Sequence, residues 1–187
     1  MRITDQPQKI KLGTPVTILE AKKQLQIEPE FTADDQHIDL IVSIAIEKIE
    51  EDTNSDVYET SNVLEFEPNC QGQVTYEIYQ SPLLSFTKLE KLTSDGQSWE
   101  EIPVTAYKVK GKFLKIIVEI LETIETKRFR ATYKTGFSDD EMPKVIKGAA
   151  LIKIADFWDS ERQGYTMNVQ PNKAYESLIS KHIRNYW

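Results

Sequence analysis

The apolar positions along the chain follow two different periods. In residues 32–55, apolar side chains recur at i, i+3, i+4, i+7 and i+11, which is the spacing of one face of an α-helix; they are Ile38, Ile41, Val42, Ala45 and Ile49. Leu40 and Ile44 widen this stripe, so we expect the helix to pack against more than one neighbour. A short helix is predicted before it, because Thr17 and Glu20 have the spacing of a capping box.

From about residue 62 to residue 135 the period changes to two. Segments such as "QVTYEIY" and "RFRATYKTG" are rich in β-branched and aromatic residues, and turn signals such as Asp95-Gly96 separate them. Phe129, Ala131 and Tyr133 alternate with polar residues, as in a sheet with one buried face. We predict about six antiparallel strands.

Helical spacing returns towards the C-terminus. Ser138 or Asp139 can cap the next helix, and Pro143 is expected in its first turn. The neighbouring acids, Asp140 and Glu141, stabilise the positive N-terminal end of this helix. In residues 144–158, apolar side chains lie on nearly every face of the helix. This helix must therefore be enclosed by its own fold, by a partner, or by both. A last amphipathic helix is predicted from a cap at Asn172, with its apolar face at Tyr175, Leu178, Ile179, His182, Ile183 and Tyr186.

This order of elements predicts an α+β fold. Residues 1–60 and 136–187 are expected to form one helical bundle, and residues 61–135 an inserted antiparallel β domain. With 40% hydrophobic residues in 187, the chain can bury a core of this size.

Composition narrows the function. The apolar runs are interrupted before the roughly 20 residues that a membrane span needs, and the first residues show no signal peptide, so we expect a soluble cytoplasmic protein. The lone Cys70 excludes an internal disulfide framework.

The negative charge of the chain is concentrated in one segment. The whole chain has a net charge of −7, and residues 28–59 hold eleven acids and one lysine, a net charge of −10. Such a surface is a poor phosphate binder.

Two acidic groups are candidate metal sites, but each has a simpler explanation. Asp139, Asp140 and Glu141 are adjacent and cannot converge on one ion, whereas a helix start accounts for them. Asp34, Asp35 and Asp39 near His37 fit the solvated face of a helix. No phosphate loop, catalytic triad or zinc motif appears. We therefore expect neither an enzyme nor a cofactor.

Three segments in order resemble the head-to-tail connector proteins of tailed bacteriophages, also called DNA-packaging adaptors. Residues 16–54 are similar to the family's "VTxxEAKxxLxI" helix and the helix that follows it. "YQSPLLSFTKLEKLTSDGQSWEEIPVTAYKV" is similar to its middle, and "RATYKTGFSDDEMPKVIKGAALIKIADFWDSER" to its long helix. The strand-rich middle is typical of the longer members.

The resemblance implies a structural role in the neck of a virion. It implies a ring of about twelve copies that docks on the portal protein after DNA packaging, meets a tail-side stopper or tail-completion protein, and lets DNA pass without specific binding. Assembly in the host cytoplasm is implied, and no membrane partner. We expect the subunit or portal contacts among the following helix residues: Ile41, Ile44, Ile152, Trp158, Arg162, Tyr175, Ile179 and Tyr186.

Two alternatives from other classes stay open. One is a non-catalytic binding module in which the β domain holds a peptide or sugar through Trp99 and Tyr107. The other is a divalent-metal hydrolase that uses the two acidic groups named above.

Overall fold

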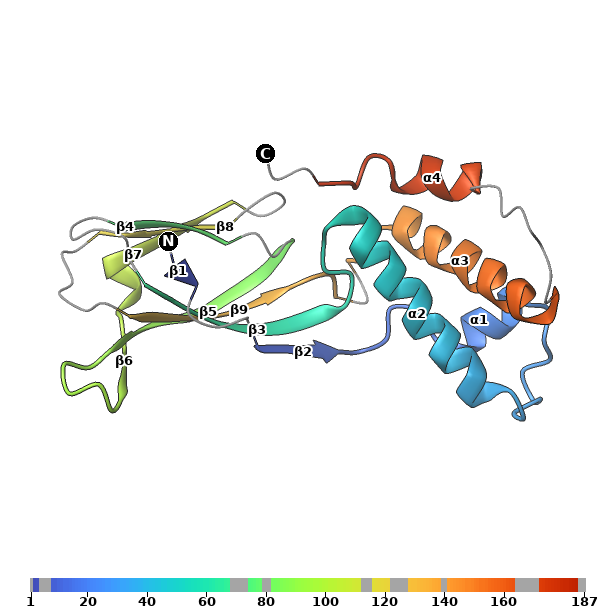
Figure 1. Ribbon diagram of the computed structural model, residues 1–187, viewed down its shortest axis with the longest axis horizontal. Coiled ribbons are helices and arrows are strands. Elements are labelled where there is room, and N and C mark those ends of the chain that lie inside the picture. The colour runs from blue at the N-terminus through green and yellow to red at the C-terminus, as the bar shows by residue number, and fades with distance from the viewer. Residues whose placement is uncertain are drawn as a thin grey trace. The chain divides into compact units, whose positions relative to one another are not determined.

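The computed structural model describes residues 2–3, 8–67, 74–78, 82–111, 116–121, 128–138, 141–163 and 172–184, with the side chains of 2–3, 74–75, 78, 116 and 159–163 left out. The chain forms two compact units (Figure 1). The sheet unit comprises Met1–Leu12 and Tyr58–Ser138, and the helical unit Gly13–Val57 and Asp139–Asn185. The mixed α+β class predicted from the sequence is confirmed.

The described residues of the helical unit form four α-helices: α1 (Ile18–Gln24), α2 (Asp35–Thr53), α3 (Lys144–Gln163) and α4 (Lys173–Ile179). α3 packs against α1, α2 and α4. The helical spacing along α2 is confirmed, because every residue of the predicted stripe is buried. The core consists of Ile38, Ile41, Val42, Ala45, Ile46 and Ile49 of α2, Ile146, Ala149, Ala150, Ile154 and Trp158 of α3, and Tyr175 and Ile179 of α4.

Side-chain caps begin two of these helices as predicted. Thr17 and Glu20 form the full capping box of α1, with the Glu20 backbone N–H donating to Thr17 Oγ1 over 3.2 Å and the Thr17 backbone N–H donating to Glu20 Oε2 over 3.0 Å. Asn172 caps α4 by accepting from the backbone N–H of Ala174 over 3.2 Å.

The predicted start of α3 was wrong. The helix begins at Lys144, its first turn holds no acid, and the Lys147 N–H donates to the Pro143 carbonyl oxygen over 3.1 Å. Pro143 therefore precedes the helix instead of lying in its first turn. A proline disfavours helical backbone in the residue before it, here Met142, which explains the later start. Ser138 and Glu141 lie before the helix, and Asp139 and Asp140 are outside the described residues.

The predicted last helix is too long. α4 ends at Ile179, where the His182 N–H donates to the Ile179 carbonyl oxygen over 2.7 Å. The chain then runs along the end of α2: the Arg184 N–H donates to the Thr53 oxygen over 3.0 Å, and Asn54 Nδ2 donates to the Arg184 oxygen over 3.2 Å. These long-range hydrogen bonds replace further helical ones.

The sheet unit contains two sheets with antiparallel pairing, and antiparallel strands were predicted; the described residues hold nine strands, whereas about six were predicted. The larger has the order β1-β3-β9-β5-β6, with β2 also paired to β3. Its strands are β1 (Arg2–Ile3), β2 (Gln8–Leu12), β3 (Glu59–Glu67), β5 (Leu83–Leu92), β6 (Trp99–Glu101) and β9 (Phe129–Thr135). The smaller has the order β4-β8-β7, with β4 (Val74–Ile78), β7 (Tyr107–Lys110) and β8 (Ile116–Ile120); the short helix η1 (Val104–Ala106) precedes β7.

The two sheets enclose one apolar core. β9 alternates as predicted, with Phe129, Ala131 and Tyr133 buried. Phe66 of β3 packs on Tyr76 of β4 with ring centroids 3.9 Å apart, which joins the sheets. The buried cluster is Leu64, Phe66, Tyr76, Leu89, Ile102, Ala106, Tyr107, Val118, Ile120, Phe129, Ala131 and Tyr133.

The strands β1 and β2 differ from the expectation that residues 1–60 belong to the helical bundle. β2 pairs with β3 from Gln8 opposite Val63 to Leu12 opposite Glu59, so this segment is part of the sheet. All five β2 side chains are exposed, and Ile10 is 63% exposed. A strand whose side chains are all exposed carries little hydrophobic signal in its sequence.

Candidate interaction surfaces

The predicted contact residues do not lie on one surface. Ile41, Trp158, Tyr175 and Ile179 are buried inside the helical unit, and Ile152 is half-buried. Ile44 is exposed. The side chain of Arg162 and the whole of Tyr186 lie outside the described residues. The neighbouring helices thus cover much of the apolar surface of α3 that the sequence left without an explanation.

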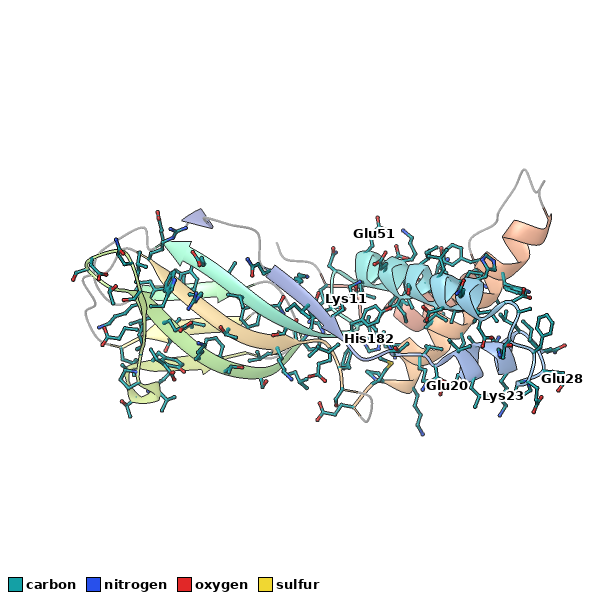
Figure 2. The ribbon with its side chains drawn as sticks, turned by 90° about the horizontal axis from the view of Figure 1, so that it is seen from below. Lys11, Glu20, Lys23, Glu28, Glu51 and His182 are labelled. Atoms are coloured by element: carbon teal, nitrogen blue, oxygen red, sulfur yellow. The ribbon has the colours of Figure 1, made fainter. Side chains whose placement is uncertain are left out.

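The outer face of α2 carries the clearest exposed apolar pair. Leu40 is 55% and Ile44 42% exposed, and their separation of four residues places them on adjacent turns of one face. Glu47 and Glu51 continue this face towards the C-terminal end of the helix, and Figure 2 shows Glu51 pointing away from the ribbon. We call Leu40, Ile44, Glu47 and Glu51 the α2 outer face.

Acidic and basic side chains are unevenly spread over the helical unit. Asp39, Glu47 and Glu51 of α2 are exposed. In contrast, exposed lysines lie at the start of α3, at the start of α4 and just after α4: Lys144, Lys173 and Lys181. The unit therefore has an acidic helix and a group of exposed lysines on other elements.

Two of the acids on α2 form ion pairs with a lysine of the same helix. Lys48 Nζ lies 2.8 Å from Glu51 Oε2 and 3.0 Å from Asp52 Oδ1, and these contacts raise the pKa of Lys48. Such pairs on an exposed helix contribute only about 0.3–0.5 kcal/mol each. They orient the acids without removing the negative potential of the helix.

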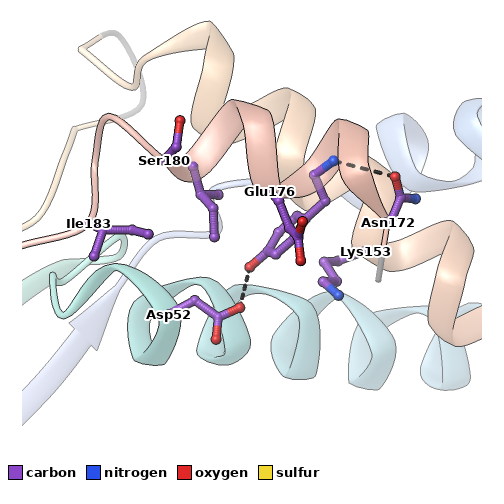
Figure 3. A pocket seen from close by; sticks show the side chains of 8 residues that line it. Asp52, Lys153, Asn172, Glu176, Ser180 and Ile183 are labelled. Atoms are coloured by element: carbon purple, nitrogen blue, oxygen red, sulfur yellow. Dashed lines mark hydrogen bonds between the residues drawn. The ribbon is translucent and has the colours of Figure 1, made fainter. Parts of the chain in front are cut away.

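A cavity of about 520 Å³ lies beside α2, α3 and α4 (Figure 3). In it, the Tyr175 hydroxyl donates to Asp52 Oδ2 over 2.6 Å, and Lys153 Nζ lies 4.2 Å from the centroid of the Tyr175 ring. Burial, together with the hydrogen bond to Asp52, raises the pKa of Tyr175. Asn172, also in the lining, caps α4 and donates to Asp156. Because these polar groups bind one another, they hold the helices together, and we assign the cavity no ligand.

The candidate metal ligands that the structure describes make other contacts. Asp35 forms an ion pair with the buried Lys22 at 2.6 Å, and Lys22 Nζ also donates to the Pro29 oxygen over 3.1 Å. His37 packs on Trp158 with ring centroids 5.6 Å apart. No group of three His, Cys, Asp or Glu side chains suited to a metal ion occurs among the described residues. Cys70, Asp139 and Asp140 are not among them.

The aromatic pair of the binding-module alternative does not form a platform. Tyr107 lies in the core between the sheets, with its ring centroid 5.7 Å from that of Phe86. Trp99 belongs to the opposite face of the larger sheet, where Arg130 lies 4.5 Å from its ring centroid. A ligand could not contact both rings at once.

Arg130 also organises the charges on that face of the sheet. Its Nε donates to Glu90 Oε2 over 2.9 Å, and Lys88 Nζ lies 2.8 Å from Glu90 Oε1. The Arg130 hydrogen bond, with help from Lys88, lowers the pKa of the Glu90 carboxyl. This buried carboxylate ties β5 to β9 and is structural.

No family model and no curated protein matches this sequence. Solved structures do match, over almost the whole chain. A chain in the neck of the empty gene transfer agent particle, computed with C6 symmetry, superposes with a TM-score of 0.74 at 15% identity, covering 96% of this chain and 97% of that one.

Two related structures agree with this match. A chain in the virion of the native gene transfer agent particle gives a TM-score of 0.75 at 13% identity, with 96% of both chains covered. One in the neck of the native particle, computed with C12 symmetry, gives 0.70 at 14% identity, covering 96% of this chain and 97% of that one. This chain has the fold of those neck chains. The match agrees with the connector resemblance seen in the sequence.

None of the described helices is long and apolar enough to cross a membrane. The contact between Asp52 and Tyr175 was missed by sequence reasoning, because the two residues are far apart in the chain and no local pattern links them. The exposure of Leu40 was also missed: its position predicted a second packing partner, and the described part of the chain supplies none there, whereas the exposed Ile44 had been expected among the contact residues.

Proposed function

We propose that this chain is a structural subunit of a head-to-tail connector ring in the neck of a tailed phage or phage-like particle. The observation that carries the proposal is the superposition of 96% of the chain on chains of gene transfer agent necks. One of those structures was computed with twelvefold symmetry, and we propose the same number of copies here. The ring docks on the portal protein after DNA packaging and contacts a tail-side stopper or tail-completion protein. The role is structural and not catalytic.

We propose that the α2 outer face is one contact between neighbouring subunits. In a ring, each subunit presents one surface to the next subunit and a different, complementary surface to the previous one. The exposed pair Leu40 and Ile44 offers apolar area on adjacent turns of one helix, which a neighbouring subunit can bury. The acids beside this pair are opposite in charge to the exposed lysines near α3 and α4. This complementarity favours a second copy of this chain as the partner that covers the α2 outer face.

An acidic helical unit also suits a channel through which DNA moves. Lys and Arg supply the sequence-independent affinity of proteins for phosphates, whereas the helical unit has exposed carboxylates outside the α2 outer face, at Glu28, Glu30 and Asp39. We therefore expect no measurable retention of double-stranded DNA by the purified protein at physiological salt.

Native mass spectrometry and electron microscopy, with and without the cognate portal protein, test the ring. We expect a closed ring of about twelve copies, on its own or on the portal. The variant Leu40→Glu/Ile44→Glu should weaken it at least tenfold. Val104→Glu is the matched control, because Val104 is 72% exposed but belongs to the sheet unit. A chain that stays monomeric at high concentration and does not bind the portal would refute the proposal.

A further inference from the structure

The larger sheet has an outermost strand at each end. β1 and β2 pair with successive parts of β3 at one end of the sheet, β6 lies at the other end, and no strand among the described residues pairs beyond β2 or β6. An outermost strand leaves one row of backbone N–H and C=O groups without a sheet partner, and such a row can pair with a strand of another chain. The sheet therefore offers two places where a further strand can be added.

On the core-facing side of the sheet, the two edges carry opposite charges. Lys9 and Lys11 of β2 stand opposite Asn62 and Thr60, which are both buried on that side. At the other edge Glu100 of β6 stands opposite Lys91, with which it forms an ion pair at 3.2 Å, and Lys91 stands opposite the core residue Phe129. Residues directly opposite each other share a face. Lys9, Lys11 and Glu100 are all exposed.

On the outer side of the sheet, the two edges carry apolar groups. Ile10 and Leu12 of β2 stand opposite Ser61 and Glu59, and they are 63% and 38% exposed. Trp99 and Glu101 of β6 lie on this same side, Trp99 beside Arg130 and Glu101 opposite Glu90. Placing β6 beside β2 would thus bring Glu100 to the lysines on one side and Trp99 to Ile10 and Leu12 on the other.

The strand directions allow this contact to repeat. Each neighbouring pair in the path β2-β3-β9-β5-β6 is antiparallel, so β2 and β6 run in the same direction. Copies that are related by the small rotation of a many-membered ring keep that direction nearly unchanged. The strand β6 of one copy would therefore meet β2 of the next as a parallel pair.

We propose that β6 of one subunit adds in parallel to β2 of the next, so that the larger sheets of neighbouring copies form one continuous sheet. The proposal rests on the ring function above and names a second contact, independent of α2. Like-with-like contacts between two β2 or two β6 edges are disfavoured, because each would place equal charges opposite each other. β6 has only three residues and provides few hydrogen bonds, so the contact gains its strength from closure of the ring.

Disulfide cross-linking of the full-length chain tests the contact directly. In a Cys70→Ser background, the variant Lys11→Cys/Glu100→Cys places one thiol on each edge. Four strand spacings separate these edges within a chain, about 19 Å, which is too far for a disulfide. Mild oxidation at high protein concentration should therefore give a ladder of covalent multimers. The control Lys11→Cys/Lys108→Cys moves the second thiol to an exposed position of β7 and should give only background dimers.

Charge reversal provides a second, independent readout. Lys9→Glu/Lys11→Glu makes both edges acidic, and Glu100→Lys/Glu101→Lys makes both basic. We expect each variant alone to associate about tenfold more weakly than the unchanged chain, and an equimolar mixture to recover. Lys23→Glu/Lys108→Glu, at two exposed positions outside both proposed contacts, changes the net charge by the same amount as the first variant and should have no effect. Melting curves check that each variant folds.

The outcomes separate this proposal from the ring itself. Suppose that rings form, but Lys11→Cys/Glu100→Cys cross-links no more than its control. This result would overturn the sheet contact and leave the ring function intact. A mixture of the two reversed variants that associates no better than either alone would also overturn it. Absence of a ring both in solution and on the portal would refute the proposed function, whatever the cross-linking shows.

Discussion

Gly136 is the position at which the structure makes the sharpest quantitative prediction. It follows β9 directly, has a φ of +91°, and its backbone N–H donates to the Pro82 oxygen over 2.9 Å. A Cβ at this position would lie 1.8 Å from the carbonyl oxygen of Tyr58 and 2.6 Å from its carbonyl carbon. The variant Gly136→Ala therefore combines a left-handed backbone conformation with a collision against backbone atoms.

Gly96 separates these two effects. It has a φ of +70° in the turn between β5 and β6, and a Cβ there would meet nothing within 4 Å. Gly96→Ala should lower the free energy of unfolding by about 1–2 kcal/mol, the cost of left-handed backbone for a residue with a side chain. Gly136→Ala should cost about 3–4 kcal/mol, because moving Tyr58 adds a penalty of the size seen for overpacking.

Urea denaturation followed by circular dichroism would measure both variants. Hydrogen exchange then locates the loss, which for Gly136→Ala should concentrate in the paired strands β3 and β9. If Gly136→Ala costs no more than Gly96→Ala, the close approach of Tyr58 to Gly136 is wrong.

The remaining predictions concern the polar contacts within each unit. Tyr175→Phe removes the 2.6 Å hydrogen bond to Asp52 and should lower the free energy of unfolding by about 1.5–3 kcal/mol in urea denaturation at pH 7; no change would mean that the contact does not hold α4 to α2. Glu90 has a lowered pKa because of Arg130, so its stabilisation is present above the carboxyl's unfolded pKa of about 4.3 and is lost as pH falls through the lower folded value. Melting temperatures between pH 7 and pH 3 should therefore fall less steeply for Glu90→Gln than for the unchanged chain, and equal slopes would contradict this. Thr17→Ala removes the cap of α1 and should cost about 1 kcal/mol in urea denaturation, whereas Thr105→Ala, at an exposed position, should cost little.

Much of the fold could be predicted because its signals are local. The capping box at Thr17, the cap at Asn172, the stripe on α2 and the alternation along β9 all depend on residues within a few positions of one another. The prediction failed where distant contacts override local preference. α4 stops at Ile179 because the following backbone bonds to Thr53 and Asn54, and a helical spacing that continues to Tyr186 gives no sign of this.

The sequence by itself determined the α+β class, the elements with a buried face, and the acidic character of residues 28–59, because composition and periodicity depend only on which residues are present and how they are spaced. Only the tertiary structure decided which apolar groups remain exposed. Ile41 and Ile44 were both expected from the sequence to be contact residues, yet Ile41 lies in the core and Ile44 on the surface. Whether an apolar side chain is available to a partner depends on what packs against it, and for α2 and α3 that packing comes from segments far away in the chain.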